Sequence, residues 1–219
     1  MFLELENVLN ANELGRLRQL AAEIKFVDGR VSNPAAYSKN NTQADVSDAR
    51  SQEASKILLQ ALARNPEFQA YAMPDFIAPP LVCKYNPSMN YGPHSDAAFM
   101  TISGRRLRSD LSCTIFLADP ATYEGGELTI HLIDGILQFK CQPGTAVIYP
   151  SWTIHEVRPV TKGERLVAIT FIESVIKDPQ KREMLWTLNE VSELEGNNMH
   201  PSNRTRLEQV RQNLLRLWS

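Results

Sequence analysis

The chain has 219 residues, of which 43% are hydrophobic and 22% charged, and this globular composition excludes wholesale disorder. Its 23 basic and 25 acidic side chains give a formal net charge of −2, which favours neither a nucleic-acid partner nor an anionic membrane surface. The cysteines Cys83, Cys113 and Cys141 are widely spaced, which argues against a disulfide framework and a thiolate zinc site.

The first residues, MFLELENVLN, are acidic where a signal peptide would be basic. No apolar run approaches the roughly 18 residues that span a bilayer. We therefore expect a soluble, cytoplasmic protein with no membrane partner.

Residues 1–75 are expected to be mainly helical. Asn10 and Glu13 have the spacing of a capping box ahead of apolar residues at helical intervals, and a second helix is expected over about 52–64. The polar, turn-rich stretch over 28–45 is too long for a simple connection. We treat it as a candidate lid over a binding site.

From about residue 78 to 175, short β-type runs alternate with Gly, Pro and Asp, which is typical of a sandwich or barrel. The strongest local signal is a hairpin, in which ELTIHLI and ILQFKC are joined through Asp134 and Gly135. Two helices are expected near the C-terminus, the second capped by Ser202 or Asn203. We expect them to cover the core, with a dimer interface as the alternative.

The candidate functional residues begin with His94 and Asp96, in the sequence His94-Ser95-Asp96. Residues i and i+2 of an extended segment point to the same side, so this imidazole and this carboxylate can bind one ion. They would supply two members of a 2-His-1-carboxylate triad, which leaves positions on Fe(II) open for a co-substrate and oxygen. Alone the motif is weak, because any surface loop can contain it.

A second imidazole and a cation strengthen this interpretation. His155 lies at the head of an expected strand 59 residues after Asp96, and Arg165 follows ten residues later beyond a Thr-Lys-Gly turn. A hairpin of that length would return Arg165 beside the strand that carries His155. A bound carboxylate, held by two parallel hydrogen bonds, would explain an Arg inside a small barrel.

Other polar residues have plainer interpretations. Tyr85 fits two roles equally well, as a donor to a ligand oxygen or as a core tyrosine. His131 alternates with apolar neighbours in a half-buried strand and is expected to face solvent. His200, in the loop between the terminal helices, is expected to be exposed.

With these residues in view, the chain resembles the bacterial PKHD-type hydroxylases, which are prolyl/lysyl hydroxylase-type dioxygenases dependent on Fe(II) and 2-oxoglutarate. The resemblance covers nearly the full length and includes FVDGRVSNPAAYSKNN, YNPSMNYGPHSDAAF, LRSDLSCTIFLADPATYEGGELTI, PGTAVIYPSWTIHEVRPVTKGER and KREMLWTLNE. By position, it implies that His94, Asp96 and His155 bind iron. It likewise implies that Arg165 binds a carboxylate of 2-oxoglutarate. FIES and IKD, near residues 171–178, depart from the family pattern away from these positions.

The resemblance implies a mainly β fold with flanking helices, in which a double-stranded β-helix, or jelly roll, forms the core. It divides the chain into a dioxygenase domain over 1–175, with its jelly-roll core over 78–175, and a helical extension over 176–219 packed on that core. It implies Fe(II), with 2-oxoglutarate and O2 as co-substrates and L-ascorbate as an optional reductant. The implied reaction hydroxylates a substrate and releases succinate and CO2.

Two other functions remain open. A non-catalytic jelly-roll sensor would bind metal or 2-oxoglutarate without releasing succinate. A zinc-dependent hydrolase or isomerase would use the same ligands but leave Arg165 without a role. The substrate of a hydroxylase could be a small metabolite, a siderophore-related compound or a prolyl or lysyl peptide, and the protein a monomer or a homodimer.

Overall fold

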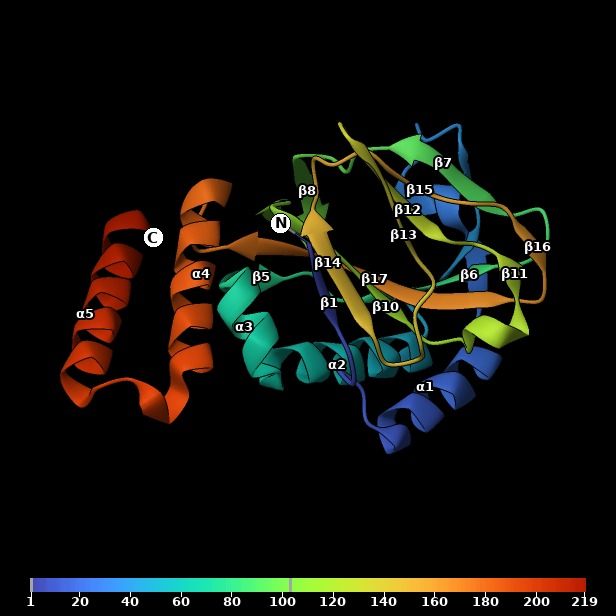
Figure 1. Cartoon of the computed structure of the whole chain (residues 1–219). Helices are drawn as coiled ribbons and strands as arrows, with labels where there is room; N and C mark the ends of the chain where they lie inside the picture. Colours follow the sequence, from blue (N-terminus) through green and yellow to red (C-terminus); the bar gives the residue numbers. More distant parts are fainter. Residues whose placement is uncertain (1, 103) are drawn as a thin grey trace.

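The computed structural model describes residues 2–102 and 104–219, and its core consists of two antiparallel β-sheets (Figure 1). The larger sheet has eight strands. In spatial order they are β1 (Leu3–Leu5), β14 (Ala146–Pro150), β10 (Leu111–Phe116), β17 (Arg165–Ser174), β6 (Leu81–Tyr85), β4 (Thr42–Ala44) and β2 (Phe26–Asp28), while β5 (Pro74–Ile77) pairs with the end of β17.

The smaller sheet has five strands, in the order β13 (Gly135–Phe139), β12 (Leu128–Leu132), β15 (His155–Val157), β7 (Asn90–His94) and β3 (Lys39–Asn40). Two short ribbons, β11 (Glu124–Gly125) with β16 (Val160–Lys162) and β8 (Phe99–Ile102) with β9 (Arg105–Arg108), complete the β structure of the described residues. Buried side chains from both main sheets form one apolar cluster, so the sheets face each other as in a jelly roll. The expectation of a mainly β fold is confirmed.

Three helices pack on the larger sheet and share its second apolar cluster: α1 (Ala11–Glu23), α2 (Ala49–Arg64) and α3 (Pro66–Ala72). The capping box of α1 is confirmed, because Asn10 accepts from the Glu13 amide and Glu13 accepts from the Asn10 amide, both at 3.0 Å. Pro66 occupies the first turn of α3, where its missing N–H costs no hydrogen bond.

The N-terminal region is less helical than expected, because it also contributes four short strands. Strand β1 extends one edge of the larger sheet, and β2 and β4 extend the other. Strand β3 instead pairs with β7 of the smaller sheet. Since β3 and β4 are nearly consecutive, residues 39–44 close one side of the space between the sheets. Pieces of two or three residues have too little periodicity to be recognised in the sequence.

The predicted hairpin is confirmed as β12 and β13, with Leu128 opposite Phe139 and Leu132 opposite Gly135. The predicted hairpin between the strands of His155 and Arg165 is wrong. Strand β15 belongs to the smaller sheet and β17 to the larger one, and β16 pairs with β11 between them. The chain therefore crosses from one sheet to the other over this stretch.

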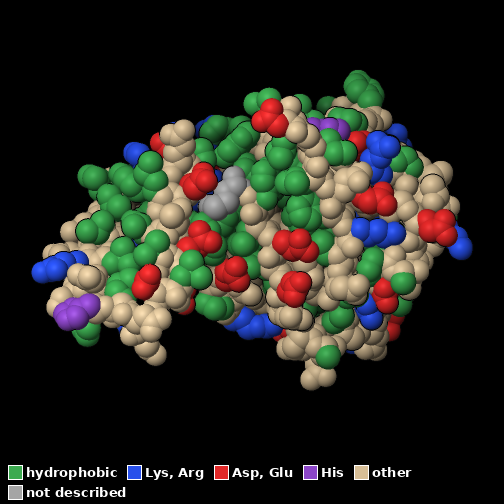
Figure 2. All heavy atoms as spheres, viewed as in Figure 1, with side chains coloured by type: hydrophobic (Ala, Val, Ile, Leu, Met, Phe, Trp, Pro, Cys, Tyr) green, Lys and Arg blue, Asp and Glu red, His purple; other side chains and the backbone are tan. Residues whose placement is uncertain are grey.

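The chain ends in α4 (Pro179–Glu195), a short 3-10 turn η3 (Gly196–Asn198) and α5 (Pro201–Trp218). The expected cap of α5 at Ser202 or Asn203 is wrong, because His200 accepts from the Ser202 amide and Pro201 begins the helix. Helix α5 has no buried residue and packs on α4 rather than on a sheet (Figure 1). Hydrophobic side chains gather over these helices in Figure 2, with Leu194 and Leu217 exposed.

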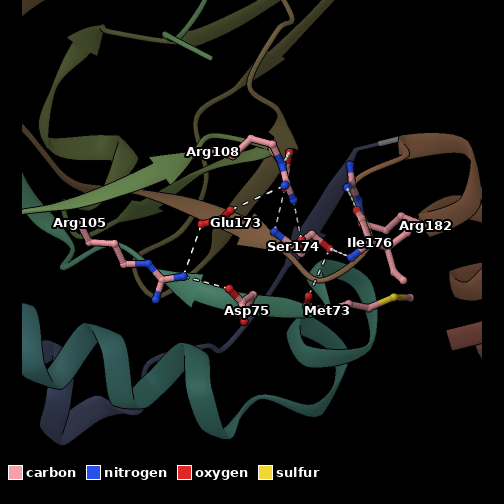
Figure 3. A network of polar contacts seen from close by, with 9 residues as sticks. Met73, Asp75, Arg105, Arg108, Glu173, Ser174, Ile176 and Arg182 are labelled. Atoms are coloured by element: carbon pink, nitrogen blue, oxygen red, sulfur yellow. Dashed lines mark hydrogen bonds and ion pairs between the residues drawn. The ribbon is translucent and has the colours of Figure 1, made fainter. Parts of the chain in front are cut away.

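A polar network joins the end of β17 to its neighbours (Figure 3). Arg105 contacts Asp75 at 2.9 Å and Glu173 at 3.5 Å, which ties β9 to β5 and β17. Arg182, at the start of α4, donates to the Ile176 carbonyl at 3.0 Å. These contacts fix the direction in which the chain leaves the larger sheet.

The packing of α4 predicts that two tryptophans contribute very different amounts to the free energy of unfolding. Trp186 is buried and meets the Tyr71 ring edge to face at 5.4 Å, whereas Trp218 is half-buried beside Lys181. Trp186→Ala should lower the free energy of unfolding by about 3–5 kcal/mol. Trp218→Ala should cost about 1 kcal/mol or less. Urea denaturation measures both values, and equal losses would contradict this description of α4.

Candidate metal centre

Three side chains meet where two neighbouring inner strands of the smaller sheet, β7 and β15, end and begin. His94 ends β7 and His155 begins β15, and the two residues are directly paired across the strands. Asp96 follows β7, and its carboxylate oxygens lie 3.9 Å from His94 Nε2 and 3.7 Å from His155 Nε2. One ligand atom from each residue lies within 4.8 Å of the other two, which is close enough to bind one ion.

Both imidazoles are oriented by backbone carbonyls. His94 Nδ1 lies 2.8 Å from the Gly92 oxygen, and His155 Nδ1 lies 2.9 Å from the Thr153 oxygen. A carbonyl can only accept, so each Nδ1 carries the proton and each Nε2 keeps its lone pair for a metal.

The electrostatic setting keeps His94 neutral. Burial, the neighbouring His155 and the Lys39 ammonium lower the pKa of His94, while the Gly92 carbonyl and Asp96 oppose them. The Tyr91 ring stacks on His94 with a centroid separation of 3.6 Å. A neutral ring is the form that binds metal ions.

Asp96 accepts a hydrogen bond from a serine that the local sequence patterns did not indicate as part of the site. Ser112, on β10 of the larger sheet, donates to Asp96 Oδ2 at 2.5 Å, and its oxygen lies 2.8 Å from that of Ser151. The Asp96 amide also donates to the Ser151 carbonyl. A serine in a largely apolar run was the signal in the sequence, but its partner could not be inferred from local spacing.

Arg165 is a buried cation that comes from the opposite sheet. It begins β17, opposite Tyr85 of β6, and is only 1% exposed. All three guanidinium nitrogens lack a hydrogen-bond partner, and no carboxylate of a described residue lies within 4.0 Å of them. The Tyr85 and Phe116 rings lie beside it, at 5.0 and 5.7 Å from the guanidinium carbon. Among the described residues, this buried cation therefore has aromatic contacts but no hydrogen-bond or ion-pair partner.

The backbone leaves room for the Arg165 side chain. Gly126 has a φ of +70°, and a Cβ atom there would lie 2.9 Å from Arg165 Cδ. Any larger residue would be strained and would displace the arginine. Gly126 thus allows a close approach of the backbone to Arg165, while Gly125 makes room for the Pro159 carbonyl.

Tyr85 lies in the same interior, 4% exposed, and burial raises its pKa, so its hydroxyl stays protonated. His131 lies elsewhere, on β12, with its Nε2 3.2 Å from Glu156 Oε1 and its side chain partly exposed. His200 is exposed, as expected. Cys83, Cys113 and Cys141 are free and buried.

The donor set fits ferrous iron. Two imidazoles and one carboxylate form the 2-His-1-carboxylate pattern of non-haem Fe(II) oxygenases. The unpartnered guanidinium fits the carboxylate of a bound acid. Fold and site thus have the features of an Fe(II)- and 2-oxoglutarate-dependent oxygenase.

Comparison with known proteins agrees with this class. Residues 80–173 match the family model of the 2OG-Fe(II) oxygenase superfamily. A PKHD-type hydroxylase of Sphingopyxis alaskensis is 50% identical over 216 residues, which cover 98% of each chain. The chain therefore belongs to the PKHD-type hydroxylases and is a 2-oxoglutarate-dependent dioxygenase that uses Fe(II) and O2.

Solved structures show the same fold at low identity. A Trichoplax adhaerens prolyl hydroxylase in complex with a hypoxia inducible factor peptide has a TM-score of 0.62 and 15% identity, covering 84% of this chain and 86% of that one. HygX of Streptomyces hygroscopicus, with nickel, 2-oxoglutarate and hygromycin B bound, has a TM-score of 0.52 and 13% identity, covering 77% and 81%. These likenesses confirm the jelly-roll core.

The contact between Ser112 and Asp96 predicts a loss of metal affinity without a loss of fold. Ser112→Ala should raise the dissociation constant for Fe(II) by about 10- to 100-fold, because the carboxylate loses the donor that orients it. Anaerobic titration against a coloured chelator measures this constant. Ser109→Ala is the matched control, since the Ser109 hydroxyl is buried without a partner. Unchanged affinity in the Ser112 variant would contradict the role.

Proposed function

We propose that His94, Asp96 and His155 hold the ferrous ion of this dioxygenase. We further propose that Arg165 binds the carboxylate of 2-oxoglutarate that lies far from the metal. The observation that supports this most strongly is the Arg165 guanidinium, which is buried with three unpartnered nitrogens. An isolated buried charge costs several kcal/mol, and a dicarboxylate bound between the sheets would offset that cost.

Each residue has a separate task in this proposal. The two histidines present Nε2 to the metal in a fixed tautomer, and Ser112 orients Asp96. Tyr85 lies beside Arg165, and its protonated hydroxyl donates a hydrogen bond to the same carboxylate. When bound, iron and 2-oxoglutarate supply the oxidising power that hydroxylates a substrate, with release of succinate and CO2.

The substrate is proposed to enter beside His94. A pocket of about 390 Å³ opens there, lined by Asn33, residues 35–38, Tyr91, His94 and Ser95. The Trichoplax enzyme is described with a peptide and HygX with hygromycin B, so a small molecule and a prolyl or lysyl peptide are both admissible here. A siderophore-related compound belongs to the first group.

Several broader expectations stay proposals. We propose one dioxygenase domain over 1–175 with the helical extension over 176–219, and a cytoplasmic protein that is a monomer or homodimer. L-Ascorbate is proposed as a reductant of the iron. Among the described residues, no helix is both long and apolar enough to cross a membrane. The non-catalytic sensor finds no support in the relatives, which are named hydroxylases.

Succinate release tests the metal ligands. Conversion of 2-oxoglutarate to succinate should require Fe(II) and O2, and His94→Ala or Asp96→Ala should reduce it at least 100-fold. His131→Ala should retain the wild-type rate, because His131 pairs with Glu156 outside the cluster. Chromatographic quantification of succinate measures these rates. Wild-type turnover in either ligand variant would remove the assignment.

Arg165→Met tests the carboxylate site through binding alone. The dissociation constant for 2-oxoglutarate should rise about 10- to 150-fold, because a charge-assisted hydrogen bond contributes about 1.5–3 kcal/mol. Without 2-oxoglutarate, the variant should be at least as stable as the wild type, because an unpaired buried charge is removed. Calorimetry and thermal unfolding measure both quantities.

Arg158→Met is the control, since Arg158 is half-exposed and contacts Glu156. It should leave both quantities unchanged. An unaltered 2-oxoglutarate constant in the Arg165 variant would refute the proposed role.

A further inference from the structure

A second buried cation lies close to the metal cluster. Lys39, on β3, is 6% exposed and pairs across the strands with Tyr91 of β7. Its Nζ lies 5.6 Å from the centroid of the Tyr91 ring, and that ring stacks on His94. One tyrosine ring therefore separates the ammonium group from a proposed iron ligand.

Lys39 has few partners for a buried ammonium group. It donates one hydrogen bond, at 2.8 Å, to the Ser32 hydroxyl, which itself lies 2.7 Å from Gln43 Oε1. An ammonium group has three donors, so two remain without an acceptor in the described chain. No carboxylate of a described residue lies within 4.0 Å of Nζ.

The acids whose charge acts on Lys39 are engaged elsewhere. Burial lowers the pKa of Lys39, and Asp28, which raises it by electrostatic attraction without an ion pair, forms a 2.6 Å ion pair with Arg30. Asp96 belongs to the metal cluster. Burial raises the pKa of the neighbouring Cys83 thiol to about 11, so Cys83 supplies no negative charge at neutral pH.

The charges of the proposed iron and 2-oxoglutarate site then balance without Lys39. Ferrous iron and Arg165 bring three positive charges, and Asp96 and 2-oxoglutarate bring three negative ones. Lys39 adds one positive charge in a region shielded from solvent, where an unpaired ion is costly. A further anion would restore neutrality and accept the two free hydrogen bonds.

We propose that Lys39 binds the carboxylate of the substrate, which is a small organic acid. This proposal rests on the proposed function of the site. The pocket beside His94 borders the same region, because Tyr91 lines that pocket and its ring centroid lies 5.6 Å from Lys39 Nζ. Since the ammonium lies inside and not on the rim, it selects a small acidic molecule over an extended neutral peptide.

An anion of minimal size tests the site independently of substrate shape. Crystals of the protein with Zn(II) and 2-oxoglutarate are soaked in sodium bromide, and anomalous diffraction locates the halide. We expect bromide in contact with Lys39 Nζ while 2-oxoglutarate contacts Arg165. The peak should vanish in Lys39→Met and persist in Lys84→Met.

Lys84 is the matched control because it lies on β6 of the larger sheet, alternates with the buried residues Cys83 and Tyr85 and so faces away from the space between the sheets, and pairs with Glu164 at 3.1 Å. In solution, calorimetric titration of the same complex with acetate should give a dissociation constant at least tenfold larger in Lys39→Met than in the wild type. In Lys84→Met it should stay within twofold of the wild type.

Three results would overturn the proposal: no bromide at Lys39 in the wild type, bromide retained in Lys39→Met, or a 2-oxoglutarate carboxylate on Lys39 itself. If Lys39→Met fails to fold, the wild-type soak still tests the proposal, because it shows whether bromide binds at Lys39. A failure of the proposed function has a different signature, because 2-oxoglutarate would then be missing from Arg165 whatever the bromide does.

Discussion

A positive charge without a partner, enclosed between two β-sheets, is the main physical constraint on this molecule. The Arg165 guanidinium lies where solvent cannot screen it and where the described chain offers no carboxylate. Folding alone gains nothing from such a group, because its desolvation exceeds what the Tyr85 and Phe116 rings return. If an anion binds there as proposed, it would offset this cost, and stability and ligand binding would be linked at this residue.

The two-sheet architecture gives this constraint its chemical use. The histidines belong to the smaller sheet and Arg165 to the larger one, so a dicarboxylate that reaches both would link the sheets. Ser112 already links them, since it reaches from β10 to Asp96. Residues 39–44 close one side of the same space and carry Lys39 into it. Arg165, Asp96 and Lys39 are thus buried or partly buried charged side chains that the two sheets bring toward one region.

Local patterns in the sequence predicted local features well. The capping box at Asn10, the hairpin through Gly135 and the closeness of His94 to Asp96 depend on residues a few positions apart. Together with the family resemblance, they were sufficient for the fold class and for the candidate metal cluster.

Features set by distant pairing could not be predicted from local spacing. The short strands of the N-terminal region form only because sheet edges are available to them. The crossing that places Arg165 on the opposite sheet depends on β16 pairing with β11. Ser112 and Lys39 look like ordinary strand residues until the fold brings them to Asp96 and Tyr91.

The most direct test is a crystal structure grown anaerobically with iron and 2-oxoglutarate, with data collected at the iron absorption edge. We predict a single strong anomalous peak bonded to the Nε2 atoms of His94 and His155 and to Asp96, with the distal carboxylate of 2-oxoglutarate paired to Arg165. Iron bound at any other group, or an Arg165 guanidinium still without an anion, would contradict this interpretation of the site.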